Sequence, residues 1–113
     1  RLNAFEVLND GNANLKGTLS QSSDIRLKEN VKNLESKGSL RIAEFDWKNG
    51  NGHSYGFIAD EVEKIYPDMV SEDSSGYKVL NYNAAMCAKL AELEATIRKQ
   101  QEMIDKLEKL IQV

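Results

Sequence analysis

The stretch from Asn83 to Val113 restricts the fold of this chain more than any other. It contains neither glycine nor proline, and its apolar residues recur every seven positions, alternating in steps of three and four. That spacing is typical of a helix that pairs with other helices in a coiled coil. We therefore expect a coiled-coil helix here, in preference to one amphipathic helix folded back on its own domain. The expected core positions are Leu90, Leu93, Ile97, Gln100, Ile104, Leu107 and Ile111.

The same heptads leave the number of paired helices open. Isoleucine at the first core position with leucine at the second favours two strands. Met103 and Leu110 flank the seam and widen the apolar stripe, which favours three strands. Gln100 is a polar core residue that would fix the register at some cost in stability. From the pattern alone, dimer and trimer are about equally supported.

The segments before this helix predict a small α+β region with short hairpins. Residues 1–21 predict a β-hairpin, because two apolar segments flank an Asp-Gly turn signal at Asp10. Residues 24–35 have apolar residues at roughly helical spacing, followed by Gly38 at the distance of a C-cap, and predict a helix.

The middle of the chain, residues 39–82, contributes two further hairpins and a short helix. "LRIAEFDW" and "HSYGFIA" flank "KNGNG", which predicts strands around a glycine-rich loop. "DEVEKIY" predicts a short helix that ends before Pro67, since the residue before a proline disfavours the α conformation. "MVSEDSSGYKVLNY" predicts two short strands around a Ser-Ser-Gly turn.

Composition excludes several classes of function. A net charge of −3 at pH 7 gives no basic surface for nucleic acid or an anionic membrane. One cysteine, Cys87, and one histidine, His53, can form neither an intrachain disulfide nor a zinc cluster. We expect no metal, no cofactor and no membrane span. Because the sequence opens on Arg1, we expect it to be part of a longer protein.

Most other reactive side chains have simple structural explanations. We expect Cys87 to be a small buried residue on the C-terminal helix, and His53 to be a partly buried packing residue beside an aromatic ring. The acidic residues Asp60, Glu61 and Glu63 would favour the positive end of the short helix.

One motif, "QSSDIRLKEN" at residues 21–30, carries possible chemistry. If Asp24 caps a helix, Ser23 lies just outside it, and the side chain of Lys28 leans back toward Ser23. A lysine can serve as the base for a serine nucleophile only when its amine is partly neutral. On local physics alone, a solvated helix start explains the motif better than catalysis does.

Three segments in order and spacing change that assessment. "SSDIRLKENV", "YGFIADEVEKIYPDMV" and "YNAAMCAKLAELEATI" leading into heptads resemble the C-terminal intramolecular chaperone auto-processing domain of phage tail spikes and tail fibres. The resemblance covers residues 20–113. It implies that residues 1–22 end the preceding shaft, residues 23–82 form the chaperone and auto-processing region, and residues 83–113 form the coiled coil.

The resemblance also implies a function. Three chains would assemble into an intertwined parallel homotrimer, template the fibre or spike shaft, and then each cut itself between Ser22 and Ser23. Ser23 would be the nucleophile and Lys28 its base, with Asp24 and Arg26 in support. Cleavage would occur in the host cytoplasm during phage assembly and would release this domain from the virion protein.

Three other functions remain possible at this stage. The chain could be a trimerisation module without catalysis, or the related self-cleaving domain of a membrane-bound animal transcription factor. It could also be part of an adhesin whose helix binds a helix of another protein.

Overall fold

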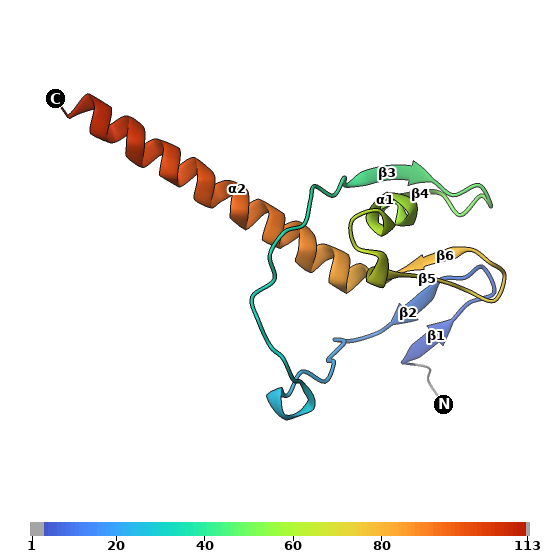
Figure 1. Ribbon diagram of the computed structural model, residues 1–113. Helices are drawn as coiled ribbons and strands as arrows, with labels where there is room; N and C mark the ends of the chain where they lie inside the picture. Colours follow the sequence, from blue (N-terminus) through green and yellow to red (C-terminus); the bar gives the residue numbers. More distant parts are fainter. Residues whose placement is uncertain (1–3, 113) are drawn as a thin grey trace.

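The computed structural model describes residues 4–112, and it is a mixed fold of three short antiparallel hairpins and one long C-terminal helix (Figure 1). Each hairpin forms its own two-stranded sheet. In chain order the elements are β1 (Phe5–Val7), β2 (Ala13–Leu15), the 3₁₀ turn η1 (Ile25–Leu27), β3 (Ala43–Asp46), β4 (His53–Gly56), α1 (Ala59–Glu63), the 3₁₀ turn η2 (Pro67–Met69), β5 (Val70–Glu72), β6 (Lys78–Leu80) and α2 (Tyr82–Ile111). The predicted α+β class, the three hairpins, the short helix before Pro67 and the long helix are confirmed.

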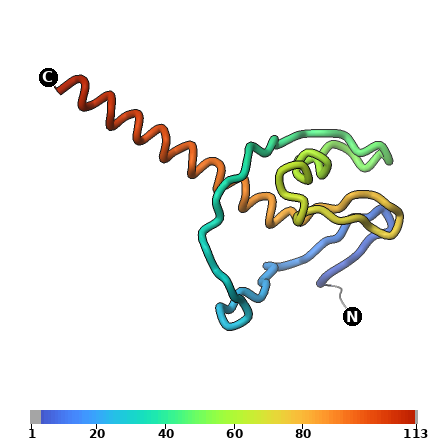
Figure 2. Tube along the Cα trace, in the orientation of Figure 1, coloured from blue at the N-terminus to red at the C-terminus, as the bar shows by residue number. Residues whose placement is uncertain are grey.

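The molecule is elongated. Its radius of gyration is 19.7 Å and its extents are 71 × 39 × 27 Å, whereas a compact domain of this length has a radius of gyration of ~13 Å. Two features cause the difference. The C-terminal half of α2 projects away from the rest, and the chain between β2 and β3 runs out to η1 and back (Figures 1 and 2). Both carry exposed apolar side chains, which predicts that other surfaces cover them.

The core forms where α1 and the first turns of α2 meet. Val62 of α1 is 1% exposed and packs with two alanines of α2, Ala85 and Ala88. Leu40, Phe57 and Tyr66 complete the buried cluster. Alanine at two positions three apart on α2 lets that face approach closely, and each large buried apolar side chain contributes about 1.5–3 kcal/mol. This small core fixes α2 to the domain.

At Gly56, the β3–β4 hairpin closely approaches α2. A Cβ atom at Gly56 would overlap the ring of Tyr82, so only glycine admits that ring. The Tyr82 hydroxyl lies 3.5 Å from the carbonyl oxygen of Phe57. The side chain of Asn81 accepts a hydrogen bond of 3.1 Å from the Ala84 amide and caps α2. The helix therefore begins at a fixed point against β4.

The expected helix over residues 24–35 is wrong. Only Ile25–Leu27 form a 3₁₀ turn, and residues 28–42 have no regular structure. Asn30 has a φ of 54°, a left-handed conformation that interrupts a helix. A twelve-residue helix is marginal without tertiary packing, and no element of the described chain covers its apolar residues. Gly38 is consequently not a C-cap; it lies against the side chain of Ile65.

Helix α2 has two different faces. One face packs on the core through Ala85 and Ala88. Another face carries the predicted heptad residues, and its apolar side chains are exposed: Ile97 by 63% and Leu107 by 55%. The alternative that the helix folds back on its own domain holds only for its first turns. Pairing with other helices stays a prediction.

Candidate functional site

A single turn brings the two ends of the "SSDIRLK" motif together. The Leu27 amide donates a hydrogen bond of 3.0 Å to the carbonyl oxygen of Asp24, and the Lys28 amide donates one of 3.1 Å to that of Ile25. A 3₁₀ turn has three residues per turn, so the chain reverses within a few residues. Lys28 then leaves the turn in an extended conformation, with φ −121° and ψ 151°.

The Lys28 Nζ atom donates a hydrogen bond of 2.8 Å to Ser23 Oγ. The sequence predicted this meeting from a helical residue leaning back, but the structure achieves it by a different route. An extended lysine, placed by η1, reaches across the turn to the serine that precedes it. Both residues are exposed in the single chain. The pair has hydrogen-bonding distance for proton transfer and no surrounding surface that excludes water.

Asp24 and Arg26 hold the turn in shape. Asp24 Oδ1 accepts a hydrogen bond of 2.9 Å from the Arg26 amide, which caps η1 as the sequence predicted. The Arg26 guanidinium donates two more hydrogen bonds to the same carboxylate, one of 3.1 Å from Nε to Oδ1 and one of 2.8 Å from Nη2 to Oδ2. The side chain of Arg26, with its backbone amide, lowers the pKa of Asp24 below its usual value. The two charges offset one another beside the serine–lysine pair.

Residues 28–35, here called the arm, connect this pair to the body. Its side chains are exposed, with Leu34 at 49%. The arm ends at residues 36–40, here called the clasp. There Glu92 Oε1 accepts a hydrogen bond of 2.8 Å from the Leu40 amide, and Oε2 accepts one of 3.0 Å from the Ser39 hydroxyl. Glu92 was not among the residues predicted from the sequence.

Three further hydrogen bonds complete the clasp. Lys89 Nζ donates a hydrogen bond of 2.7 Å to the Leu40 carbonyl oxygen and one of 3.2 Å to Glu92 Oε2. The Tyr66 hydroxyl accepts a hydrogen bond of 2.9 Å from the Lys37 amide. Glu92 lies four residues after Ala88 and seven after Ala85, on the face that packs on the core. That spacing is the signal from which a domain-facing glutamate could have been found.

The other reactive residues lie apart from this pair. His53 begins β4, and its ring nitrogens lie 2.7 Å from Asp46 Oδ1 and 2.9 Å from Glu44 Oε1. Its ring also meets Tyr55 edge-on, with centroids 5.2 Å apart. The expectation of a partly buried packing residue is wrong, because His53 is an exposed residue held by two carboxylates across the hairpin.

The acidic residues of α1 have ion-pair partners, and the cysteine differs from expectation. Glu61 forms a two-point ion pair with Arg41, with an Nη2–Oε2 distance of 2.6 Å. Lys78 Nζ donates a hydrogen bond of 2.8 Å to Glu63 and one of 3.3 Å to Asp60. Asp60 and Glu61 do lie in the first turn of α1, as expected from the helix dipole, and these ion pairs are additional contacts of the cluster. Cys87 is exposed rather than buried, because it lies on α2 outside the face that packs on the core.

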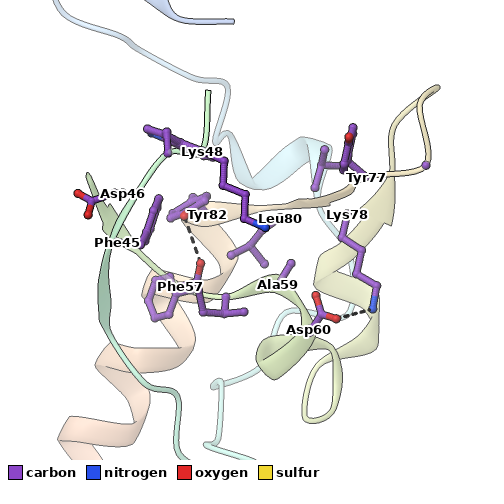
Figure 3. A pocket seen from close by; sticks show the side chains of 14 residues that line it. Phe45, Asp46, Lys48, Phe57, Ala59, Asp60, Tyr77, Lys78, Leu80 and Tyr82 are labelled. Atoms are coloured by element: carbon purple, nitrogen blue, oxygen red, sulfur yellow. Dashed lines mark hydrogen bonds and ion pairs between the residues drawn. The ribbon is translucent and has the colours of Figure 1, made fainter. Parts of the chain in front are cut away.

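An aromatic cleft of about 950 Å³ lies between the β3–β4 and β5–β6 hairpins (Figure 3). Phe45, Phe57 and Tyr82 gather along one side, and Lys78 reaches Asp60 on the other. Neither Ser23 nor Lys28 lines this cleft. Of its charged groups, Lys78 and Asp60 pair with each other, and Asp46 pairs with His53.

Within residues 4–112, no group of three histidine, cysteine, aspartate or glutamate side chains converges as metal ligands would. Over the same described residues, neither helix combines the length and apolarity that a bilayer span requires.

A protein-family model matches residues 23–71 of this chain, and that family is Peptidase_S74, chaperone of endosialidase. The match confirms the resemblance to the chaperone domain of phage tail fibres and spikes. It starts at Ser23 and extends through the clasp and α1 to β5. It indicates an intramolecular chaperone with a peptidase-type domain.

Proposed function

We propose that this chain, with residues 23–71 matching the chaperone-of-endosialidase family, drives trimerisation and folding of a phage tail fibre or tail spike and then releases itself by autoproteolysis. The cut falls between Ser22 and Ser23. The observation that carries the proposal is the 2.8 Å hydrogen bond between Lys28 Nζ and Ser23 Oγ. The start of the family match at the same serine supports it.

The chemistry follows from the position of the nucleophile. Ser23 supplies both the hydroxyl and the amide nitrogen of the bond before it. With Lys28 neutral, its amine takes the hydroxyl proton as Oγ attacks the carbonyl carbon of Ser22. The C–N bond breaks, Lys28 returns the proton to the nitrogen, and an ester joins Ser22 to Ser23 Oγ. Water then hydrolyses the ester and leaves the carboxylate of Ser22 and the free hydroxyl of Ser23.

Assembly provides the switch. Ser23 and Lys28 are exposed in the single chain, and a lysine accepts a proton from serine only in its neutral form. Burial against another copy favours the neutral amine. Because η1 lies well away from α2 (Figure 2), pairing of the helices does not by itself cover Lys28, and some other surface of the assembled chains must do so.

Three copies, with their α2 helices parallel, would bury the exposed heptad stripe. The exposed apolar side chains of α2 and of the η1 region support this arrangement, because a monomer leaves them in water. Residues 1–22 then belong to the shaft, residues 23–82 to the chaperone and residues 83–113 to the coiled coil. The reaction takes place in the host cytoplasm during virion assembly, without nucleic acid, membrane or cofactor.

The test is the intact mass of the full chain after expression, with and without Lys28→Ala. The parent chain should yield two fragments whose masses locate the break at Ser22–Ser23, and the variant should stay whole. Hydroxylamine added during cleavage should release the upstream fragment as its hydroxamate. A break that persists with Lys28→Ala would contradict the proposal.

A trimerisation module without catalysis is the second candidate. The exposure of both Ser23 and Lys28 favours it, since a solvated pair needs no catalytic explanation. It predicts an intact trimer in which Ser23→Ala and Lys28→Ala leave the pattern on a denaturing gel unchanged.

A further inference from the structure

The clasp fixes the arm to α2 at a defined height on the helix. Glu92 makes two hydrogen bonds to consecutive residues, Ser39 and Leu40, and Lys89 bonds the carbonyl oxygen of Leu40. Leu40 itself is 2% exposed. Hydrogen bonds to a carboxylate are stronger than neutral ones, so this side chain is a firm anchor. The Leu40 amide is the main cause of the lowered pKa of Glu92.

Beyond the clasp, an open groove lies between the arm and α2. Its arm side is residues 33–35, and its helix side includes Cys87, Leu90 and Ala91. The lining mixes polar and apolar side chains. Leu34 and Leu90, exposed by 49% and 59%, are its large apolar ones, and both are uncovered in the single chain. Glu94 and Arg98 lie at its rim and pair at 4.0 Å, which offsets their charges.

We propose that Glu92, with Lys89, is a positioning residue, and that it holds the arm beside α2 so that the helix of a second copy covers residues 33–35 of the arm and the heptad stripe together. This inference rests on the proposed function and adds the route by which helix pairing affects the serine–lysine pair. It assigns to Glu92 no contact with the reacting atoms.

The occupant is a second copy because the groove is continuous with the heptad stripe. Leu90 belongs to both surfaces: it is a predicted core position and it lines the groove. A helix that packs on Leu90, Leu93 and Ile97 therefore also lies close to Leu34. Covering Leu34 orders one end of the arm, and Lys28 forms the other end. Since a displacement of about 1 Å can slow a reaction up to roughly a hundredfold, the position of the arm bears directly on the rate.

The single cysteine of the chain reports whether the groove is filled. The test measures the rate at which a maleimide modifies Cys87 in two proteins. One is the full chain with Ser23→Ala, and the other is the same variant that also carries Ile97→Asp and Ile104→Asp. We expect at least tenfold protection in the assembled protein. Equal rates, or protection in a species of monomer mass, would overturn the choice of occupant.

Hydrogen exchange at the Leu40 amide reports the clasp itself. In the Ser23→Ala chain, Glu92→Ala should speed this exchange at least tenfold. Glu92→Gln should speed it less, since its oxygen still accepts the Leu40 amide. Glu102→Ala, on the exposed solvent side of α2, is the matched control and should leave the exchange unchanged.

The rate of cleavage decides the positioning role. In the chain with Ser23 intact, Glu92→Ala should slow cleavage tenfold to a hundredfold, with Glu92→Gln intermediate, while helicity and oligomer mass stay unchanged. If exchange at Leu40 rises but cleavage keeps its rate, the positioning role is refuted and the proposed function stands. If the parent chain is never cut, the proposed function fails, while the Cys87 and Leu40 measurements still decide the groove and the clasp.

Discussion

Lys28 and Ser23 are joined by a hydrogen bond of 2.8 Å across one 3₁₀ turn. This contact is local, because it depends on five consecutive peptide units and on the Asp24–Arg26 pair, not on the core. The pair therefore needs no second copy to form, and in the proposed function assembly has only to change its surroundings.

Lys28→Arg separates a catalytic lysine from a structural one. Arginine keeps a positive hydrogen-bond donor near Ser23, but it does not lose its proton in a protein and so cannot act as a base. We expect no cleavage in Lys28→Arg, with unchanged helicity and oligomer mass. Lys32→Arg, on the same exposed arm, is the control and should cut at the parent rate. Intact mass over a time course measures both, and normal cleavage by Lys28→Arg would rule out the base.

Asp24 is expected to set the rate through the shape of the turn. Asp24→Ala removes the cap of η1 and the partner of Arg26 together, so the extended lysine is no longer held toward the serine. We expect cleavage to slow several-fold. Asp24→Asn keeps a good cap without the ion pair, so its cleavage rate should lie between those of the parent and Asp24→Ala. An Asp24→Ala chain as fast as the parent would show that the turn needs no cap.

The stripe on α2 is expected to control both assembly and cleavage. Ile97→Asp with Ile104→Asp places two charges on the exposed apolar face and should yield uncut monomers. Lys99→Asp with Lys106→Asp has the same spacing on a different, polar face of the helix and should leave trimer and cleavage intact. Light scattering gives the mass, and a denaturing gel gives the extent of cleavage. Efficient cleavage by the first variant as a monomer would sink the assembly switch.

Hairpins and helices were predictable where the sequence carries its own signals. The Asp-Gly turn of the first hairpin, the glycine-rich loop after Trp47 and the heptads of α2 are local patterns, and each element appears where expected. The helix predicted over residues 24–35 was wrong. The apolar residues there have the spacing of an amphipathic face, but a helix at this place has no surface in the same chain to pack on. Those residues are Ile25, Leu27, Val31 and Leu34.

The candidate site was predictable only as a set of residues. Ser23, Lys28, Asp24 and Arg26 were identified from the motif, but the geometry that joins them was not, since it depends on a 3₁₀ turn. Glu92 was missed because the heptad pattern directs attention to the other face of α2. Its contacts with Ser39 and Leu40 span more than fifty positions in the chain, and no local pattern reveals such a pairing.

Gly56 is expected to tolerate no side chain. Gly56→Ala would force the Tyr82 ring away from β4 and disturb the first turn of α2, at a cost of about 1–3 kcal/mol, as for other overpacked sites. Gly50→Ala is a poor control, because its φ of 85° adds backbone strain. Gly17→Ala, which has open space around its Cβ, is the better one. Thermal unfolding followed by circular dichroism should show a lower midpoint for Gly56→Ala only.

The clasp is expected to weaken in acid. The hydrogen bond from the Leu40 amide, followed by those from Lys89 and Ser39, lowers the pKa of Glu92 in the folded chain. A carboxyl group with a lowered folded-state pKa adds stability that is fully present above its unfolded pKa, about 4.3. That stability is lost as the pH falls through the lower folded-state pKa.

The midpoint of thermal unfolding should therefore be higher for the parent than for Glu92→Gln at pH 7. The difference should hold down to about pH 5 and shrink steadily below pH 4. Glu102→Gln, which alters an exposed carboxyl, should track the parent throughout, and a Glu92→Gln difference independent of pH would contradict a role for the charge.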